Sequence, residues 1–74
     1  MRKTLDCTGL QCPLPVAKTS MALRRLEPGD ELEVVCTDPG SLSDIPTLAE
    51  DLGHTLVSAA DEGDRQVFVI RVAG

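Results

Sequence analysis

Clusters of proline, glycine and aspartate divide this 74-residue chain into six short segments, and that punctuation limits what the chain can fold into. Apolar residues recur at every second position where a strand is indicated and at every third or fourth where a helix is indicated. Strands are predicted over residues 4–7, 31–36, 55–60 and 66–73, and helices over residues 12–26 and 45–52. The predicted order is β-α-β-α-β-β.

Each predicted helix has an apolar stripe and a stop signal. The first stripe consists of Val16, Thr19, Ala22, Leu23 and Leu26, and the helix ends at Glu27-Pro28-Gly29-Asp30. A loose turn from Leu42 leads into the second helix, whose stripe is Leu42, Ile45, Leu48, Ala49 and Leu52. Ser41 and Asp44 have the spacing of a capping box, and Gly53 is placed for a left-handed C-cap.

Two helices can cover only one face of a four-stranded sheet of this size. We therefore predict an α/β (α+β) two-layer sandwich: a four-stranded mixed sheet with both helices on one face. Phe68, Ile70 and Val72 should face the helices. The outward-facing valines are predicted to be Val35, Val57, Val67 and Val69. They form either a docking surface or a set retained for β-propensity alone.

Length and composition exclude several classes of protein. Residues 1–74 are too few for two domains, so we expect one domain with a small core. No apolar run could span a bilayer, and no signal peptide follows the basic first residues, which predicts a cytoplasmic protein. A single aromatic residue and a pI near 4.5 argue against direct nucleic-acid binding. Three cysteines, an odd number, indicate a reducing compartment.

Charge is unevenly distributed along the chain. Residues 1–26 carry five basic and one acidic side chain, net +4, whereas residues 27–74 carry eleven acidic and two basic ones, net −9. Lys18, Arg24 and Arg25 lie on the first predicted helix, away from its apolar stripe. They form either a solvated helix face or a patch that docks an acidic partner.

Cys12 is the strongest candidate for chemistry. It lies between the turn residue Gly9 and a helix start that contains Pro13 and Pro15. Free amides and the dipole at a helix N-terminus favour an anion, which predicts a thiol with a lowered pKa and hence a reactive sulfur. Lys18 would add positive charge nearby. The alternative is a small apolar residue used for packing.

The other cysteines and the single histidine suggest different roles. Cys36 is predicted to pack in the core at the end of a strand, and Cys7 either packs or resolves an oxidised Cys12. No CxxC pair is present to support a zinc site with His54, so no metal is expected. His54 follows a helix end, where its charge would complement the dipole.

The stretch Leu5-Asp6-x-x-Gly9-Leu10-x-Cys12-Pro13-x-Pro15 resembles the signature of the TusA/SirA family of small sulfur-carrier proteins. Glu27-Pro28-Gly29-Asp30, Asp38-Pro39, Asp44-Ile45-Pro46 and Gly53-His54 extend the similarity over nearly the whole chain. The resemblance implies the same β-α-β-α-β-β sandwich. It further implies that Cys12 carries sulfane sulfur as a persulfide, supported by the motif residues Asp6, Gly9, Pro13 and Pro15, without a cofactor.

The resemblance also implies partners: a cysteine desulfurase or a rhodanese-like donor, and an acceptor of the DsrE/TusD type. Such a sulfurtransferase-type carrier would serve either tRNA 2-thiouridine synthesis or cytoplasmic sulfur oxidation, and selenium would suit the same site. Two other hypotheses remain at this point. One is a non-catalytic regulatory interaction module that uses the apolar sheet face. The other is a redox switch through a Cys7–Cys12 disulfide.

Overall fold

The computed structural model describes residues 1–74 and contains one four-stranded sheet. Its strands are β1 (Arg2–Cys7), β2 (Glu31–Cys36), β3 (Thr55–Asp61) and β4 (Gln66–Arg71). They lie in the order β1-β2-β4-β3, with β1 parallel to β2 and β4 antiparallel to both of its neighbours. The predicted mixed sheet is therefore confirmed.

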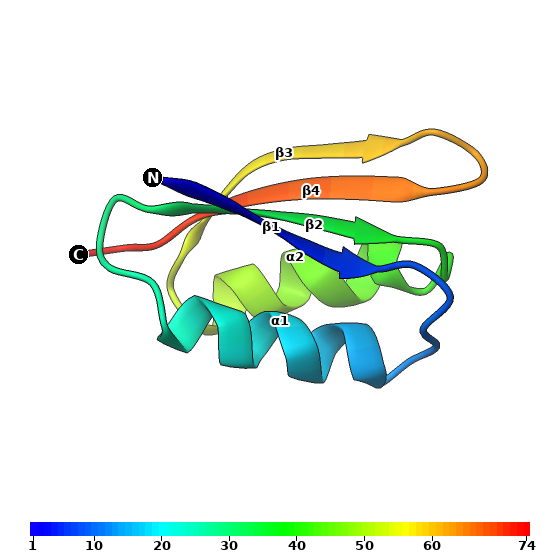
Figure 1. The fold of residues 1–74 in the computed structure, drawn as a ribbon, viewed down its shortest axis with the longest axis horizontal. Helices are drawn as coiled ribbons and strands as arrows, with labels where there is room; N and C mark the ends of the chain where they lie inside the picture. The colour runs from blue at the N-terminus through cyan, green and yellow to red at the C-terminus, as the bar shows by residue number, and fades with distance from the viewer.

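Two helices, α1 (Leu14–Arg24) and α2 (Ser41–Asp51), lie side by side on one face of the sheet (Figure 1). With eleven residues each, they fall short of the length that a membrane-spanning helix needs. Between the two layers lies the core: Cys7, Leu23, Leu32, Val34, Cys36, Ile45, Ala49, Phe68, Ile70 and Val72. The two-layer sandwich is confirmed, and β4 faces the helices as predicted.

Helix α1 begins two residues later than predicted and ends two residues earlier. Its fully buried residues are Pro15, Thr19 and Leu23, one on each successive turn. Val16, Ala22 and Leu26 are only partly buried and pack against the edge of the core. The prediction found the correct face of this helix, but it did not include Pro15, whose ring packs inward from the first turn.

Helix α2 differs more from the prediction, because it begins at Ser41 and contains Pro46 in its interior. Pro46 has no N–H to donate to the carbonyl one turn back, so the helix continues with one hydrogen bond fewer. The predicted capping box is wrong: Gly40 is the N-cap, and no side chain caps the helix. Instead, the carbonyl of Asp38 accepts the N–H of Ser41 at 2.9 Å.

The buried stripe of α2 is Ser41, Ile45 and Ala49, whereas the predicted stripe members Leu42 and Leu52 are exposed. Leu42 lies about a quarter of a turn to the side of the stripe, and Leu52 is the C-cap residue.

The C-terminus of α2 is built as predicted. Gly53 has φ +76°, and its N–H donates to the carbonyl of Glu50 at 3.0 Å. The N–H of His54 donates to the carbonyl of Ala49 at 2.9 Å, which completes a Schellman motif. This glycine is required because other residues rarely adopt that backbone conformation.

The uncovered face of the sheet is less apolar than predicted. Val35 lies opposite Val67 in the register, and Val69 lies opposite Glu33; none of these valines belongs to the core cluster, but Val69 is only 6% exposed. One end of the same face is covered by ion pairs from Glu31 to Arg2 and Arg71, at 2.8 and 2.9 Å. Val57 falls in the irregularity of the β3–β4 ladder. In the regular ladder, the docking surface suggested for this face is thus reduced to the half-buried Val35 and Val67.

Leu23→Ala should destabilise the protein by about 2–5 kcal/mol, because it leaves a cavity where α1 packs on the sheet. Leu23 is 2% exposed, whereas Met21 on the same helix is 57% exposed. The matched variant Met21→Ala should therefore change stability by no more than about 0.5 kcal/mol. Urea unfolding measures both, and equal losses would contradict this description of the core.

Candidate functional site

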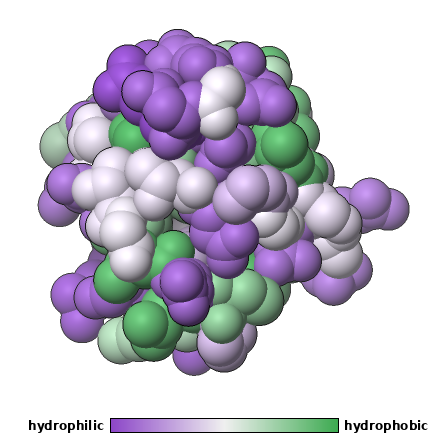
Figure 2. Space-filling view, turned by 90° about the vertical axis from the view of Figure 1, so that its right-hand side faces the viewer, coloured by the Kyte–Doolittle hydropathy of each residue, from purple (hydrophilic) through white to green (hydrophobic).

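The candidate site lies at the end of the sheet where the parallel strands β1 and β2 both finish (Figure 1). Each strand is followed by a loop that leads into a helix, so both loops and both helix N-termini meet there. Figure 2 looks onto this end of the molecule. Hydrophilic side chains gather at the top, over the β3–β4 hairpin, and hydrophobic ones appear lower, toward the helices.

Asp6 and Gly9 shape the loop that follows β1. The Asp6 carboxylate accepts the backbone N–H and the hydroxyl of Thr8, at 2.9 and 2.7 Å, and these bonds lower the pKa of Asp6. Gly9 has φ +77°, and its N–H donates to the Thr37 hydroxyl at 2.8 Å. The two loops are thereby joined, and both motif residues have a structural role.

Asp38 in the second loop holds Cys12 by its backbone. One carboxylate oxygen accepts the N–H of Cys12 at 2.9 Å, and the other accepts the N–H of Gly40 at 3.0 Å. These hydrogen bonds keep the pKa of Asp38 below its usual value, because they favour the ionised carboxylate. Asp38 therefore fixes Cys12 relative to α2.

Few donors are left at the start of α1 to bind an anion. Pro13, the N-cap, and Pro15 have no N–H, and the N–H of Leu14 donates to the carbonyl of Gln11 at 2.9 Å. Among residues 13–16, only Val16 has an N–H without a hydrogen bond in the protein. The predicted anion-binding helix start is thus wrong: Pro13 and Pro15 define the backbone path to Cys12, but they remove the amides on which the prediction relied.

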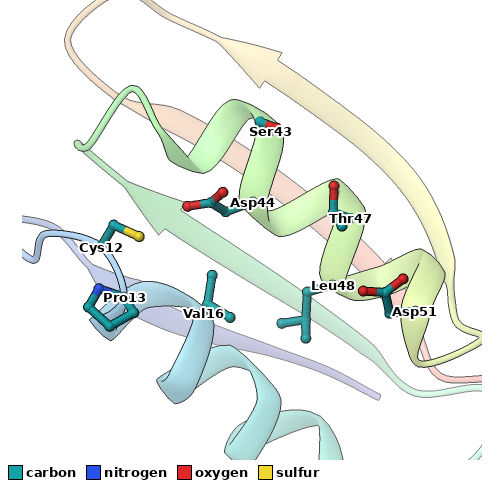
Figure 3. Close-up of a pocket in the computed structure, with 8 residues that line it drawn as sticks. All are labelled: Cys12, Pro13, Val16, Ser43, Asp44, Thr47, Leu48 and Asp51. Carbon is teal, nitrogen blue, oxygen red and sulfur yellow. The ribbon is translucent and has the colours of Figure 1, made fainter.

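Cys12 opens onto a pocket of about 490 Å³ between the two helices. Pro13 and Val16 line it from the side of α1, and the side of α2 contributes Ser43, Asp44, Thr47, Leu48 and Asp51. Figure 3 shows the sulfur pointing into this space and the Asp44 carboxylate pointing back toward it. The reactive candidate and an unpredicted acid therefore face each other.

The surroundings of Cys12 raise the pKa of its thiol, which is the reverse of the prediction. The largest cause is the Asp44 carboxylate, which can accept a hydrogen bond from the protonated thiol. Partial desolvation and the negative charges of Asp44 and Asp38 act in the same direction. The thiol is exposed, and the hydrogen bond to Asp44 has a larger effect on its pKa than its partial desolvation.

Cys7 and Cys36 are separated from this chemistry. They lie opposite each other on the parallel strands β1 and β2, and both are fully buried. Burial, reinforced by Cys36, raises the pKa of Cys7 to about 11, and burial also raises the pKa of Cys36. The thiol that faces Cys7 is therefore Cys36, not Cys12. The predicted packing role of Cys36 is confirmed, and Cys7 packs in the same way.

Lys18 and Arg24 are exposed on α1, and Arg25 is its exposed C-cap residue; none of the three forms an ion pair within the chain. Arg25 lies beside Lys3 of β1, where the two line a shallow groove. The basic residues are therefore available to a partner. They do not line the Cys12 pocket.

His54 plays no part in the site. Its Nδ1 accepts the N–H of Ala73 at 3.1 Å, and the residue does not line the Cys12 pocket. Nowhere in the chain do three or more histidine, cysteine, aspartate or glutamate side chains lie close enough together to hold a metal ion. The residues that the sequence prediction did not assign to the site are Asp38 and Asp44. Their motif positions were visible, but their proximity to Cys12 depends on the fold.

Only Cys12 should react with iodoacetamide in the native protein, whereas all three cysteines should react after unfolding in urea. Mild oxidation should leave the native monomer without a Cys7–Cys12 disulfide, because Cys7 is enclosed in the core. Intact-mass spectrometry counts the adducts and detects the loss of two hydrogens. A disulfide between Cys7 and Cys12 in the folded monomer, located by peptide mapping, would contradict the placement of Cys7.

Comparisons with known proteins find the same fold, and the matched residues include those of the candidate site. Residues 3–72 match the family described as sulfurtransferase TusA. The chain is 43% identical over 67 residues to the sulfur carrier protein TusA of Pseudomonas aeruginosa, covering 90% of this chain and 85% of that protein. It is 37% identical over 67 residues to the sulfur carrier protein TusA of Allochromatium vinosum, covering 90% and 88%.

A SirA-like protein from Desulfitobacterium hafniense has a crystal structure that matches this fold with a TM-score of 0.84. The two chains are 25% identical, and the match covers all of both. Together with the match over residues 3–72, this shows that the chain belongs to the TusA/SirA family of sulfur carriers.

Proposed function

We propose that this protein is a sulfur carrier that accepts sulfane sulfur on Cys12 as a persulfide and passes it to another protein. The observation that supports this most directly is that Cys12 is the one exposed thiol of the three and opens onto a pocket. Its position follows the loop held by Asp6, Gly9 and Asp38. Residues 1–74 act as one carrier domain in this proposal.

The transfer is thiol exchange at sulfur and requires no cofactor. The Cys12 thiolate attacks the terminal sulfur of a donor persulfide, a new S–S bond forms, and the donor's own S–S bond breaks. The donor leaves as a thiolate, which takes up the proton that Cys12 lost. In the onward step an acceptor thiolate attacks the terminal sulfur on Cys12, and Cys12 is restored. Electrons balance in both steps without an external oxidant.

The partners follow from family membership and from this chemistry. We assign the donor role to a cysteine desulfurase or a rhodanese-like protein, and the acceptor role to a protein of the DsrE/TusD type. The sulfur would go to tRNA 2-thiouridine synthesis or to sulfur oxidation in the cytoplasm, where thiols remain reduced. Both destinations require the same exposed cysteine.

Docking is assigned to the exposed basic face of α1, formed by Lys18, Arg24 and Arg25. Because these side chains have no acidic partner within the chain, a protein with an acidic patch can pair with them without breaking existing ion pairs. Such charges mainly raise the rate of encounter.

Incubating the reduced protein with a persulfide donor should add about 32 Da, the mass of one sulfur atom, at Cys12. The adduct should disappear on reduction with dithiothreitol. Cys12→Ser should abolish it, whereas Cys7→Ala should retain it. Sulfur labelling that persists in Cys12→Ser, measured by intact-mass spectrometry, would refute the assignment.

The double variant Arg24→Glu/Arg25→Glu should load more slowly from a protein donor, by about two- to tenfold at low salt, and the deficit should shrink as salt rises. Arg65→Glu, in the β3–β4 hairpin and away from the two helices, serves as a single-reversal control and should load normally. Alkylation of Cys12 should be equal in all three proteins. A double variant that loads at the normal rate would exclude this face as the docking surface.

A further inference from the structure

The pocket beside Cys12 contains acids and no base. Asp44 and Asp51 line it, and neither forms an ion pair within the chain. The β2–α2 loop adds the ionised Asp38 carboxylate, which is bonded to the backbone of Cys12. From the side of α1 the pocket receives only Pro13 and Val16, which carry no charge.

The carboxylates of α2 and of the β2–α2 loop act against the sulfur anion that thiol exchange needs. Thiol exchange proceeds through the sulfur anion, and a neighbouring carboxylate destabilises that anion. The raised pKa of the Cys12 thiol agrees with this: a hydrogen bond to Asp44 is the largest cause, followed by partial desolvation and then by the charges of Asp44 and Asp38. A persulfide at Cys12 would bring its own negative charge into the same surroundings.

The chain supplies no cation to offset this effect. Lys18 is the basic residue nearest in sequence on α1, but it does not line the pocket. The free protein therefore holds its exchangeable sulfur in an acidic environment. Only a group from outside the chain can neutralise Asp44.

We propose that Asp44 restrains Cys12 in the free carrier, and that a lysine or arginine of the docked sulfur donor or acceptor pairs with Asp44 and releases the sulfur for exchange. This rests on the proposed function of Cys12. Pairing stabilises the Cys12 anion at the moment when the partner's sulfur is within reach, and the released proton goes to water. The bonds formed and broken are those of the exchange described above.

The restraint is tested first without any sulfur donor. Asp44→Asn should react with iodoacetamide about two- to fivefold faster than the unmodified protein at pH 7, as expected for removing one half-buried neighbouring charge. Its rate should also reach its plateau at a lower pH. Glu50→Gln removes the same charge from the same helix outside the pocket and should match the unmodified protein. Equal alkylation rates for Asp44→Asn and Glu50→Gln would contradict the proposal that Asp44 restrains Cys12.

A gain-of-function pair tests whether a cation beside Asp44 is sufficient. Thr47 lines the pocket one turn after Asp44 and is exposed. Thr47→Lys should therefore accelerate alkylation of Cys12, whereas Thr47→Gln, which is neutral and of similar reach, should not. Adding Asp44→Asn to Thr47→Lys should leave little further acceleration. A Thr47→Lys protein no faster than Thr47→Gln would count against release by a cation.

Release by a partner is tested by comparing two sulfur donors. With glutathione persulfide, Asp44→Asn should gain sulfur faster than the unmodified protein. With a persulfidated cysteine desulfurase, which brings its own basic group, that advantage should vanish. An equal advantage with both donors would overturn the role of the partner's cation. If neither donor loads Cys12, the proposed function is refuted. The alkylation rates still show separately whether Asp44 restrains Cys12.

Discussion

The parallel pairing of β1 with β2 is the constraint on which the site depends. It brings the ends of two strands, distant in sequence, to the same edge, so that both following loops meet. Two hydrogen bonds then tie the loops together, from Gly9 to Thr37 and from Cys12 to Asp38. Because β1 is an edge strand, the exposed cysteine depends on β2 for its position. The placement of Cys12 is therefore a property of the pair of loops.

Much of the fold was predictable because its signals are local. The switch in apolar spacing and the turns around Pro28-Gly29 and Gly63 fixed the order of the elements. The start of α2 was not predictable in the same way. Its first turn is organised by Asp38, a residue of the preceding loop, and not by its own Ser41 and Asp44. A proline inside the helix concealed the true boundary.

The exposed cysteine was predictable from its motif, but its electrostatic surroundings were not. Local reasoning counts the helix dipole and the first-turn amides, and both favour an anion. The structure adds two carboxylates from the second loop and helix, and a hydrogen bond to one of them, Asp44, is the largest cause of the raised pKa of Cys12. A helix start with prolines has few amides to oppose them. The direction of the pKa shift is therefore a tertiary effect, and no spacing rule within residues 5–15 contains it.

Burial of both Cys7 and Cys36 makes the folded protein a monothiol toward solvent. A sulfur atom loaded on Cys12 would find no second accessible thiol on its own chain, so the load could not be discharged internally as sulfide. Its lifetime would then be set by encounters with other molecules. The same geometry directs oxidation outward: a sulfenic acid at Cys12 would be resolved by glutathione or by a second copy of the protein, giving a mixed disulfide or a covalent dimer.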